Sequence, residues 1–77
     1  MPANKLYVGN LSYSVTEDKL RELFSKYGQI KEAVVIKDKQ TDRSKGFGFV
    51  EFETPEEARK AADDLNGTEH EGRSLKV

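Results

Sequence analysis

Residues 45–52 read Lys-Gly-Phe-Gly-Phe-Val-Glu-Phe, and this stretch decides the fold. Side chains on a β-strand point alternately to the two faces of a sheet. The stretch divides into Phe47, Phe49 and Glu51 on one face and Gly48, Val50 and Phe52 on the other. Helices can cover one such face, but clustered aromatic rings left toward water usually mark a binding surface. We therefore predict a strand with one buried face and one open aromatic face.

A second stretch, LYVGNL at residues 6–11, repeats the alternation and places Tyr7 opposite its aliphatic residues. If the two strands are neighbours, Tyr7, Phe47 and Phe49 form one surface, which we call the aromatic platform. The two stretches, about 40 residues apart, resemble the hexamer and octamer signatures of the RNA recognition motif family. All eight octamer positions match the family pattern.

The resemblance covers essentially the whole chain and implies roles for individual residues. In the family, the tyrosine of the hexamer and the fifth octamer position stack on successive bases, so Tyr7 and Phe49 would do so here. Phe47 would pack between riboses, and Lys45 would contact a phosphate. The chain looks most like the small single-module forms, such as the bacterial or organellar glycine-rich RNA-binding proteins.

The length of 77 residues predicts one domain, 1–77, with a single modest core. There is no cysteine, which rules out a disulfide framework and a cysteine-rich zinc site. The first residues run into a strand without an apolar signal segment, and no stretch approaches a membrane span. We expect an intracellular, soluble protein, with the cytoplasm as first choice and the nucleus or an organelle as alternatives.

Charge is nearly balanced, with 13 basic and 14 acidic side chains and a net charge of −1. Its distribution is uneven: residues 37–45 carry four basic and two acidic side chains, whereas residues 54–72 carry six acidic and two basic ones. Phosphate neutralisation needs clustered positive charge. We therefore expect weak electrostatic binding, with a polyanion directed toward residues 37–45.

Two helices are predicted from capping residues and apolar stripes. Thr16 is a good N-cap for the first helix, which Gly28 ends. The second begins at Thr54, with Pro55 in its first turn and Glu57 completing a capping box. The other expected elements are a strand made of Ile30 and then Ala33 to Lys37, a polar loop at 38–44, a tight connection at 68–73, and a last strand whose inward residues are Leu75 and Val77.

The resulting order is strand, helix, strand, strand, helix, strand. It predicts an α+β, two-layer sandwich of the βαββαβ ferredoxin-like kind, with a four-stranded antiparallel sheet and two helices on one face. The other face of the sheet stays open.

Further residues are candidates for the RNA site. Arg43, Lys5 and Lys76 are basic residues of the loop and the flanking strands that would meet phosphates. Ile36 should lie on the open face and contact an apolar base edge. Glu51 either accepts a hydrogen bond from a base amino group or keeps an exposed strand soluble.

Three polar or aromatic residues have more ordinary explanations. Tyr13 is either a lid over the platform or part of loop packing, and packing is favoured. Asn10 is expected in a turn. His70 is a single histidine in an acidic loop, which makes a poor metal site and a poor general base. We predict no catalytic residue, no metal and no cofactor.

The predicted function is binding of single-stranded RNA by a monomer in post-transcriptional RNA metabolism, with single-stranded DNA as an alternative ligand and no membrane partner. A protein-interaction module of the same fold, binding through its acidic helical side, is the second reading. An enzyme is the third. Acylphosphatases share this topology but need an arginine in the first loop, and residues 10–14 contain none.

Overall fold

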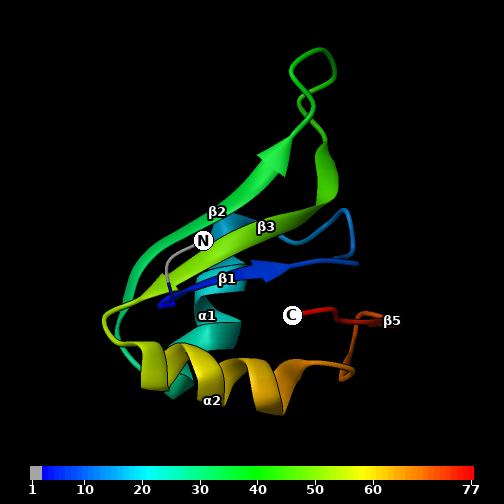
Figure 1. Cartoon of the computed structure of the whole chain (residues 1–77). Coiled ribbons are helices and arrows are strands. Elements are labelled where there is room, and N and C mark those ends of the chain that lie inside the picture. The colour runs from blue at the N-terminus through cyan, green and yellow to red at the C-terminus, as the bar shows by residue number, and fades with distance from the viewer. Residues whose placement is uncertain (1–2) are drawn as a thin grey trace.

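The order of helices and strands in the computed structural model, which describes residues 3–77, agrees with the α+β prediction. The elements are β1 (Lys5–Val8), α1 (Glu17–Phe24), the 3-10 turn η1 (Ser25–Tyr27), β2 (Ile30–Lys37), β3 (Ser44–Phe52), α2 (Pro55–Leu65), β4 (Glu69–His70) and β5 (Arg73–Ser74) (Figure 1). The loop between β2 and β3 extends beyond the rest of the molecule, at the top of Figure 1.

The main sheet has β3 at its centre, paired antiparallel with β1 on one side and β2 on the other. The register places Phe49 between Tyr7 of β1 and Val34 of β2. Strand β2 is irregular at two points, between Ile30 and Glu32 and between Val35 and Lys37. The two signature stretches are therefore neighbours in space, as the platform requires.

Both helices begin at the predicted caps. The Thr16 hydroxyl accepts a hydrogen bond from the amide of Lys19 (3.3 Å). Thr54 and Glu57 form the expected reciprocal capping box. Between Phe24 and Gly28 the first helix tightens into η1. Within residues 3–77, neither helix is long and apolar enough to cross a membrane.

One core lies between the sheet and the two helices, which shows that both helices cover the same face. Its fully buried side chains include Val8, Leu20, Phe24, Val50, Phe52 and Ala61. The rings of Phe24 and Phe52 are 6.3 Å apart between centroids and join α1 to β3. The alternation predicted for β3 is confirmed, because Val50 and Phe52 are buried while Phe49 and Glu51 are only half-buried. Leu6, expected to be buried, packs against the core but is half-buried.

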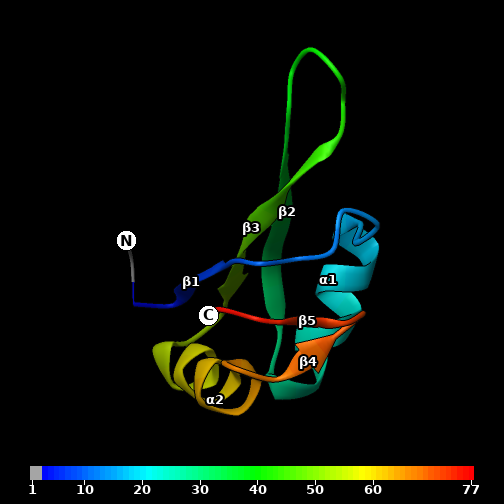
Figure 2. The same ribbon diagram turned by 90° about the vertical axis from the view of Figure 1, so that its right-hand side faces the viewer.

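The end of the chain differs from the predicted fourth strand. Residues 69–74 form a separate hairpin, β4–β5, and Lys76 makes an isolated bridge with Gly9, the residue after β1, through two hydrogen bonds (2.6 and 3.1 Å). Glu71 and Gly72 have positive φ (52° and 79°), the backbone of a two-residue hairpin turn. Leu75 is buried as expected, but its amide donates to Thr68 (2.8 Å) and is not available to β1. Figure 2 shows this hairpin beside α1.

Candidate nucleic-acid interface

The three aromatic side chains predicted for the open face form one patch. The ring centroid of Tyr7 lies 5.7 Å from that of Phe47 and 5.9 Å from that of Phe49. Tyr7 is 43% exposed, and the two phenylalanines are half-buried. These side chains come from the two adjacent strands β1 and β3, so the sheet itself sets their spacing. The patch offers flat apolar faces of a kind on which nucleobases stack.

Two neighbours shape this platform. A Cβ atom on Gly9 would lie 2.8 Å from Cε1 of Tyr7, so the missing side chain leaves room for the tyrosine ring to lie along β1. The Nζ atom of Lys5 lies 5.3 Å from the centroid of Phe49. This distance allows a cation–π attraction and places a positive charge directly at the edge of the platform.

Two aliphatic residues in the second half of β2 are half-buried: Ile36, which was predicted for the open face, and Val34, which the prediction missed. Ile36 is half-buried, between the buried Val35 and the exposed Lys37. Val34 is the register partner of Phe49 and is also half-buried, so it extends the platform across β2. Its place two residues before Ile36 in a strand was the signal that could have identified it.

Glu51 is half-buried and stands opposite Lys5 in the register of β1 and β3. Asn4 donates from Nδ2 to a carboxylate oxygen of Glu51 (3.4 Å) and to the carbonyl oxygen of Phe52 (2.8 Å). Sequence reasoning gave Asn4 no role. The carboxylate retains acceptor capacity, because a carboxylate has about four lone-pair sites.

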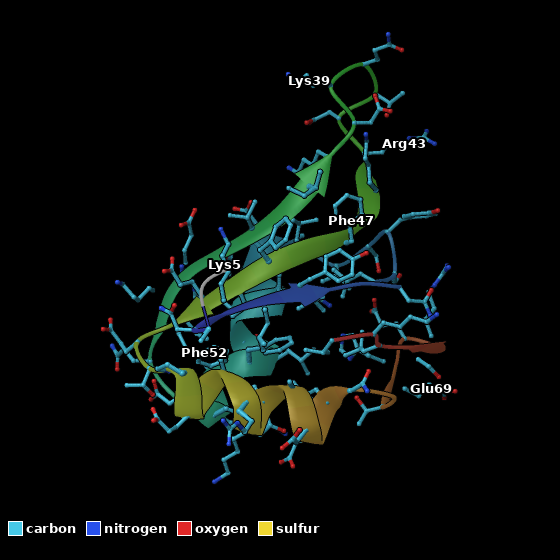
Figure 3. All side chains as sticks on the ribbon, in the orientation of Figure 1. Lys5, Lys39, Arg43, Phe47, Phe52 and Glu69 are labelled. Carbon is cyan, nitrogen blue, oxygen red and sulfur yellow. The ribbon has the colours of Figure 1, made fainter. Side chains whose placement is uncertain are left out.

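The other basic residues predicted to meet phosphates are Lys45, Arg43 and Lys76, and they lie in different parts of the fold. Lys45 and Arg43 are exposed and line, together with Phe47, a broad groove of about 1150 Å³ at the base of the β2–β3 loop. Lys76 is exposed at the pairing with Gly9. Figure 3 shows Arg43 and Lys39 toward the tip of the hairpin, above Phe47.

Charge is separated along the molecule. The basic side chains of the β2–β3 hairpin lie at one end, and the acidic helix α2 and Glu69 of the small hairpin lie at the other (Figure 3). The direction of this separation matches the sequence prediction. It favours approach of a polyanion toward the end of the sheet at which Phe47 lies.

The loop that follows β1 is tied to the small hairpin. Asn10 has a left-handed φ of 57° and donates from Nδ2 to the carbonyl oxygen of Ser74 (2.7 Å), which confirms its expected turn role. The Ser14 hydroxyl donates to a carboxylate oxygen of Glu71 (2.7 Å). This hydrogen bond lowers the pKa of Glu71, and the charges of Lys19 and His70 act in the same direction.

Tyr13, in the same loop, is not packed as expected. Its side chain is 67% exposed, and the Arg73 guanidinium carbon lies 5.7 Å from its ring centroid. His70 is half-buried beside α1. Across residues 3–77 there is no cluster of histidine, cysteine or carboxylate side chains placed to hold a metal.

Comparison with known proteins gives the family. The model of the RNA recognition motif matches residues 6–76. The chain is 51% identical over 75 residues to glycine-rich RNA-binding protein 1 of Mycosarcoma maydis, covering 97% of this chain and 43% of that protein. It is 49% identical over 75 residues to the chloroplastic small RNA-binding protein 11 of Arabidopsis thaliana, covering 97% of this chain and 51% of that one. The chain thus spans about half the length of the curated relatives it matches.

A solved structure supports the same assignment. The Rna15 RNA recognition motif with bound RNA (GU) has a TM-score of 0.87 and 36% identity to this chain, covering 97% of this chain and 80% of that one. The relatives are named for RNA binding, and the family is not one of enzymes, which confirms the expectation that this chain is no enzyme. The chain belongs to the RNA recognition motif family.

Proposed function

We propose that this chain binds single-stranded RNA on the open face of its sheet. In this proposal Tyr7 and Phe49 stack on successive bases, and Phe47 packs against the sugars between them. Ile36 and Val34 widen the apolar surface on β2. Glu51, next to Lys5, accepts a hydrogen bond from a base amino group; Lys5, Arg43, Lys45 and Lys76 contact phosphates.

The observation that carries the proposal is the contrast between the two faces of β3. On one face Val50 and Phe52 are completely buried under the helices. On the other, Phe47 and Phe49 contact Tyr7 and remain half-buried, and Tyr7 is 43% exposed. Three aromatic side chains left together toward water are costly unless a ligand covers them.

The chemistry of the platform favours a ligand with flat bases and modest charge. Stacking is worth roughly 1–3 kcal/mol per base and tolerates any base, because every base has a π-face. The net charge of −1 argues against binding by bulk charge. RNA over DNA is our choice from the resemblance to the family, and the 2′-hydroxyl is the group through which a protein distinguishes them.

The direct test is titration of labelled single-stranded RNA, and of DNA of matched sequence, with the wild-type chain, Phe49→Ala and Tyr7→Ala. We expect each alanine variant to weaken RNA binding about tenfold or more. Tyr7→Phe is the matched control, because it keeps the ring and removes only the hydroxyl, and it should bind nearly as well as the wild type.

Unchanged RNA affinity in folded Phe49→Ala and Tyr7→Ala would remove the sheet-face site. The chain would then be better explained as a protein-interaction module that uses its acidic helical side. Stronger binding to the DNA than to the RNA would support the same site but make single-stranded DNA its ligand.

For the wider role, we propose that residues 1–77 act as one monomeric RNA-binding domain in post-transcriptional RNA metabolism. The cytoplasm is the compartment expected from the sequence. The chloroplastic relative makes an organelle the alternative to examine first. Fluorescence microscopy of the tagged natural protein would distinguish the two.

A further inference from the structure

Tyr13 presents an aromatic ring outside the platform. It is more exposed than Tyr7, at 67% against 43%. The ring is nevertheless held from the protein side. A Cβ atom on Gly46 would lie 3.3 Å from its Cε1 atom, and the Arg73 guanidinium carbon is 5.7 Å from its centroid. The ring therefore lies close to Gly46 and Arg73 and leaves most of its surface open to solvent.

The loop that carries Tyr13 is also held by hydrogen bonds at Asn10 and Leu11, before the tyrosine. Arg73 serves twice, because its Nε atom donates to Oδ1 of Asn10 (3.3 Å) while its guanidinium faces the tyrosine ring. The Leu11 amide donates to the carbonyl oxygen of Gly46 on β3 (2.8 Å). A ring that is held before binding loses little conformational freedom when a ligand covers it.

The groove of about 1150 Å³ connects Tyr13 to the platform. Tyr13 and the start of α1 line one wall, and the base of the β2–β3 hairpin lines the other. Phe47 belongs both to this groove and to the platform. A strand that crosses the platform can therefore continue into the groove without leaving an aromatic surface.

The charges in the groove favour one placement of the backbone. Its cations, Lys37, Arg43 and Lys45, all lie on the hairpin wall. Its carboxylates are Glu17, Asp18, Asp38 and Asp42. The carboxylate of Glu17 accepts from the Val35 amide (3.3 Å), and that of Asp38 accepts from the Gln40 amide (2.8 Å). Asp38 and Asp42 lie on the hairpin with the three cations and leave that part of the groove with a net charge of +1, whereas Glu17 and Asp18 at the start of α1 add two negative charges. Phosphates would therefore lie along the hairpin, away from the start of α1, and bases toward Tyr13.

We propose that Tyr13 is a further base-stacking position, occupied by a nucleotide of single-stranded RNA that lies beyond Phe47. The base covers the solvent side of the Tyr13 ring, and its phosphate meets Lys45 or Arg43. Arg73 is a positioning residue that holds the ring. This inference rests on the proposed function, because it extends the same RNA strand.

The test compares RNAs of two lengths. Pools of three-nucleotide and seven-nucleotide RNAs of randomised sequence are titrated with the wild-type chain, Tyr13→Ala and Tyr13→Phe. Tyr13→Ala should weaken binding of the longer RNA about tenfold and leave the shorter RNA, which the platform can hold alone, unchanged. Tyr13→Phe retains the ring and should bind both lengths like the wild type. Thermal melting should be close to wild type for both variants, because the side chain is mostly exposed.

Three results would overturn the inference: unchanged binding of the longer RNA by Tyr13→Ala, equal weakening at both lengths, or equal weakening by Tyr13→Phe and Tyr13→Ala. The Phe49→Ala variant separates this failure from that of the proposed function. If Phe49→Ala loses affinity and Tyr13→Ala does not, the platform remains and only the further site falls. If the wild-type chain binds neither RNA, both proposals fail.

Discussion

Phe49 and Phe52 are three residues apart on β3. Because side chains on a strand alternate between the two faces, these two rings lie on opposite sides of the sheet. Phe52 is completely buried and packs on Phe24 of α1 (6.3 Å between centroids). Phe49 is half-buried, and its ring lies 5.9 Å from that of Tyr7 and 5.3 Å from the Nζ atom of Lys5. Removing each ring should therefore affect a different property of the protein.

Phe52→Ala should unfold the chain or lower its melting temperature strongly. Loss of a buried phenylalanine costs about 3–5 kcal/mol, a large part of the total stability of a small domain. Phe49→Ala should lose only aromatic contacts worth about 1 kcal/mol and remain folded while binding RNA more weakly. Thermal melting followed by circular dichroism, beside RNA titration, measures both effects. A Phe49→Ala variant that melts as early as Phe52→Ala would mean that the strand phase is wrong.

Among the helices and strands, the parts predicted correctly are those marked by a regular alternation of side chains or by helix-capping residues. β3 alternates from Lys45 to Phe52, so the two faces of this part of the strand follow from the sequence. The capping box of Thr54 and Glu57 fixes the start of α2 in the same way. In each case several residues point to one answer, and no distant contact is needed.

The C-terminal hairpin and the position of Tyr13 were not predictable in this way. The hairpin depends on Glu71, a non-glycine residue in a left-handed conformation, and on hydrogen bonds of Leu75 with Thr68 and Gly67, one with each. Tyr13 lies in an irregular loop, where no periodicity tells which side faces water. Val34, by contrast, could have been identified from its place two residues before Ile36 in the same strand. The two irregularities of β2 are what the sequence does not reveal.

The hydrogen bond from Ser14, in the loop after β1, to Glu71, in the β4–β5 hairpin, leads to a prediction about pH. Ser14→Ala removes the hydrogen bond that mainly lowers the pKa of Glu71, so that pKa should rise toward its ordinary value. A lowered carboxyl pKa stabilises the fold above the ordinary pKa, and this stabilisation is lost as pH falls through the lowered value. In Ser14→Ala the loss of folding stability on acidification should therefore be smaller than in the wild type.

An NMR titration of the Glu71 side-chain carboxyl measures this shift. Ser25→Ala is the control. The Ser25 hydroxyl donates to the Glu22 carbonyl oxygen at the end of α1 (3.0 Å), so its removal should leave the titration of Glu71 unchanged. An identical Glu71 titration in the wild type and Ser14→Ala would show that the hydroxyl does not hold the carboxylate.

For the whole molecule, the separation of basic from acidic side chains means that few phosphates are contacted. The RNA affinity should therefore depend only weakly on salt concentration. Contact with two or three phosphates should give a logarithmic salt slope between about −1.4 and −2.1, at about −0.7 per phosphate on single strands, and affinity in the micromolar range. Lys45→Gln should make this slope shallower by about 0.7, whereas Lys60→Gln, on the exposed side of α2, should leave it unchanged. Titrations at several salt concentrations test this expectation. A slope near −6 would reveal a basic surface that we have not recognised.

The central claim is that RNA covers the open face of the sheet, and NMR mapping of an isotope-labelled chain tests it most directly. Single-stranded RNA is added in steps, and the change of each backbone amide signal is recorded. We predict that the largest changes fall on β1 and β3, around Tyr7, Phe47 and Phe49, while the exposed side of α2, around Arg59 and Asp63, changes little. Largest changes on α2, with β1 and β3 unchanged, would contradict the claim.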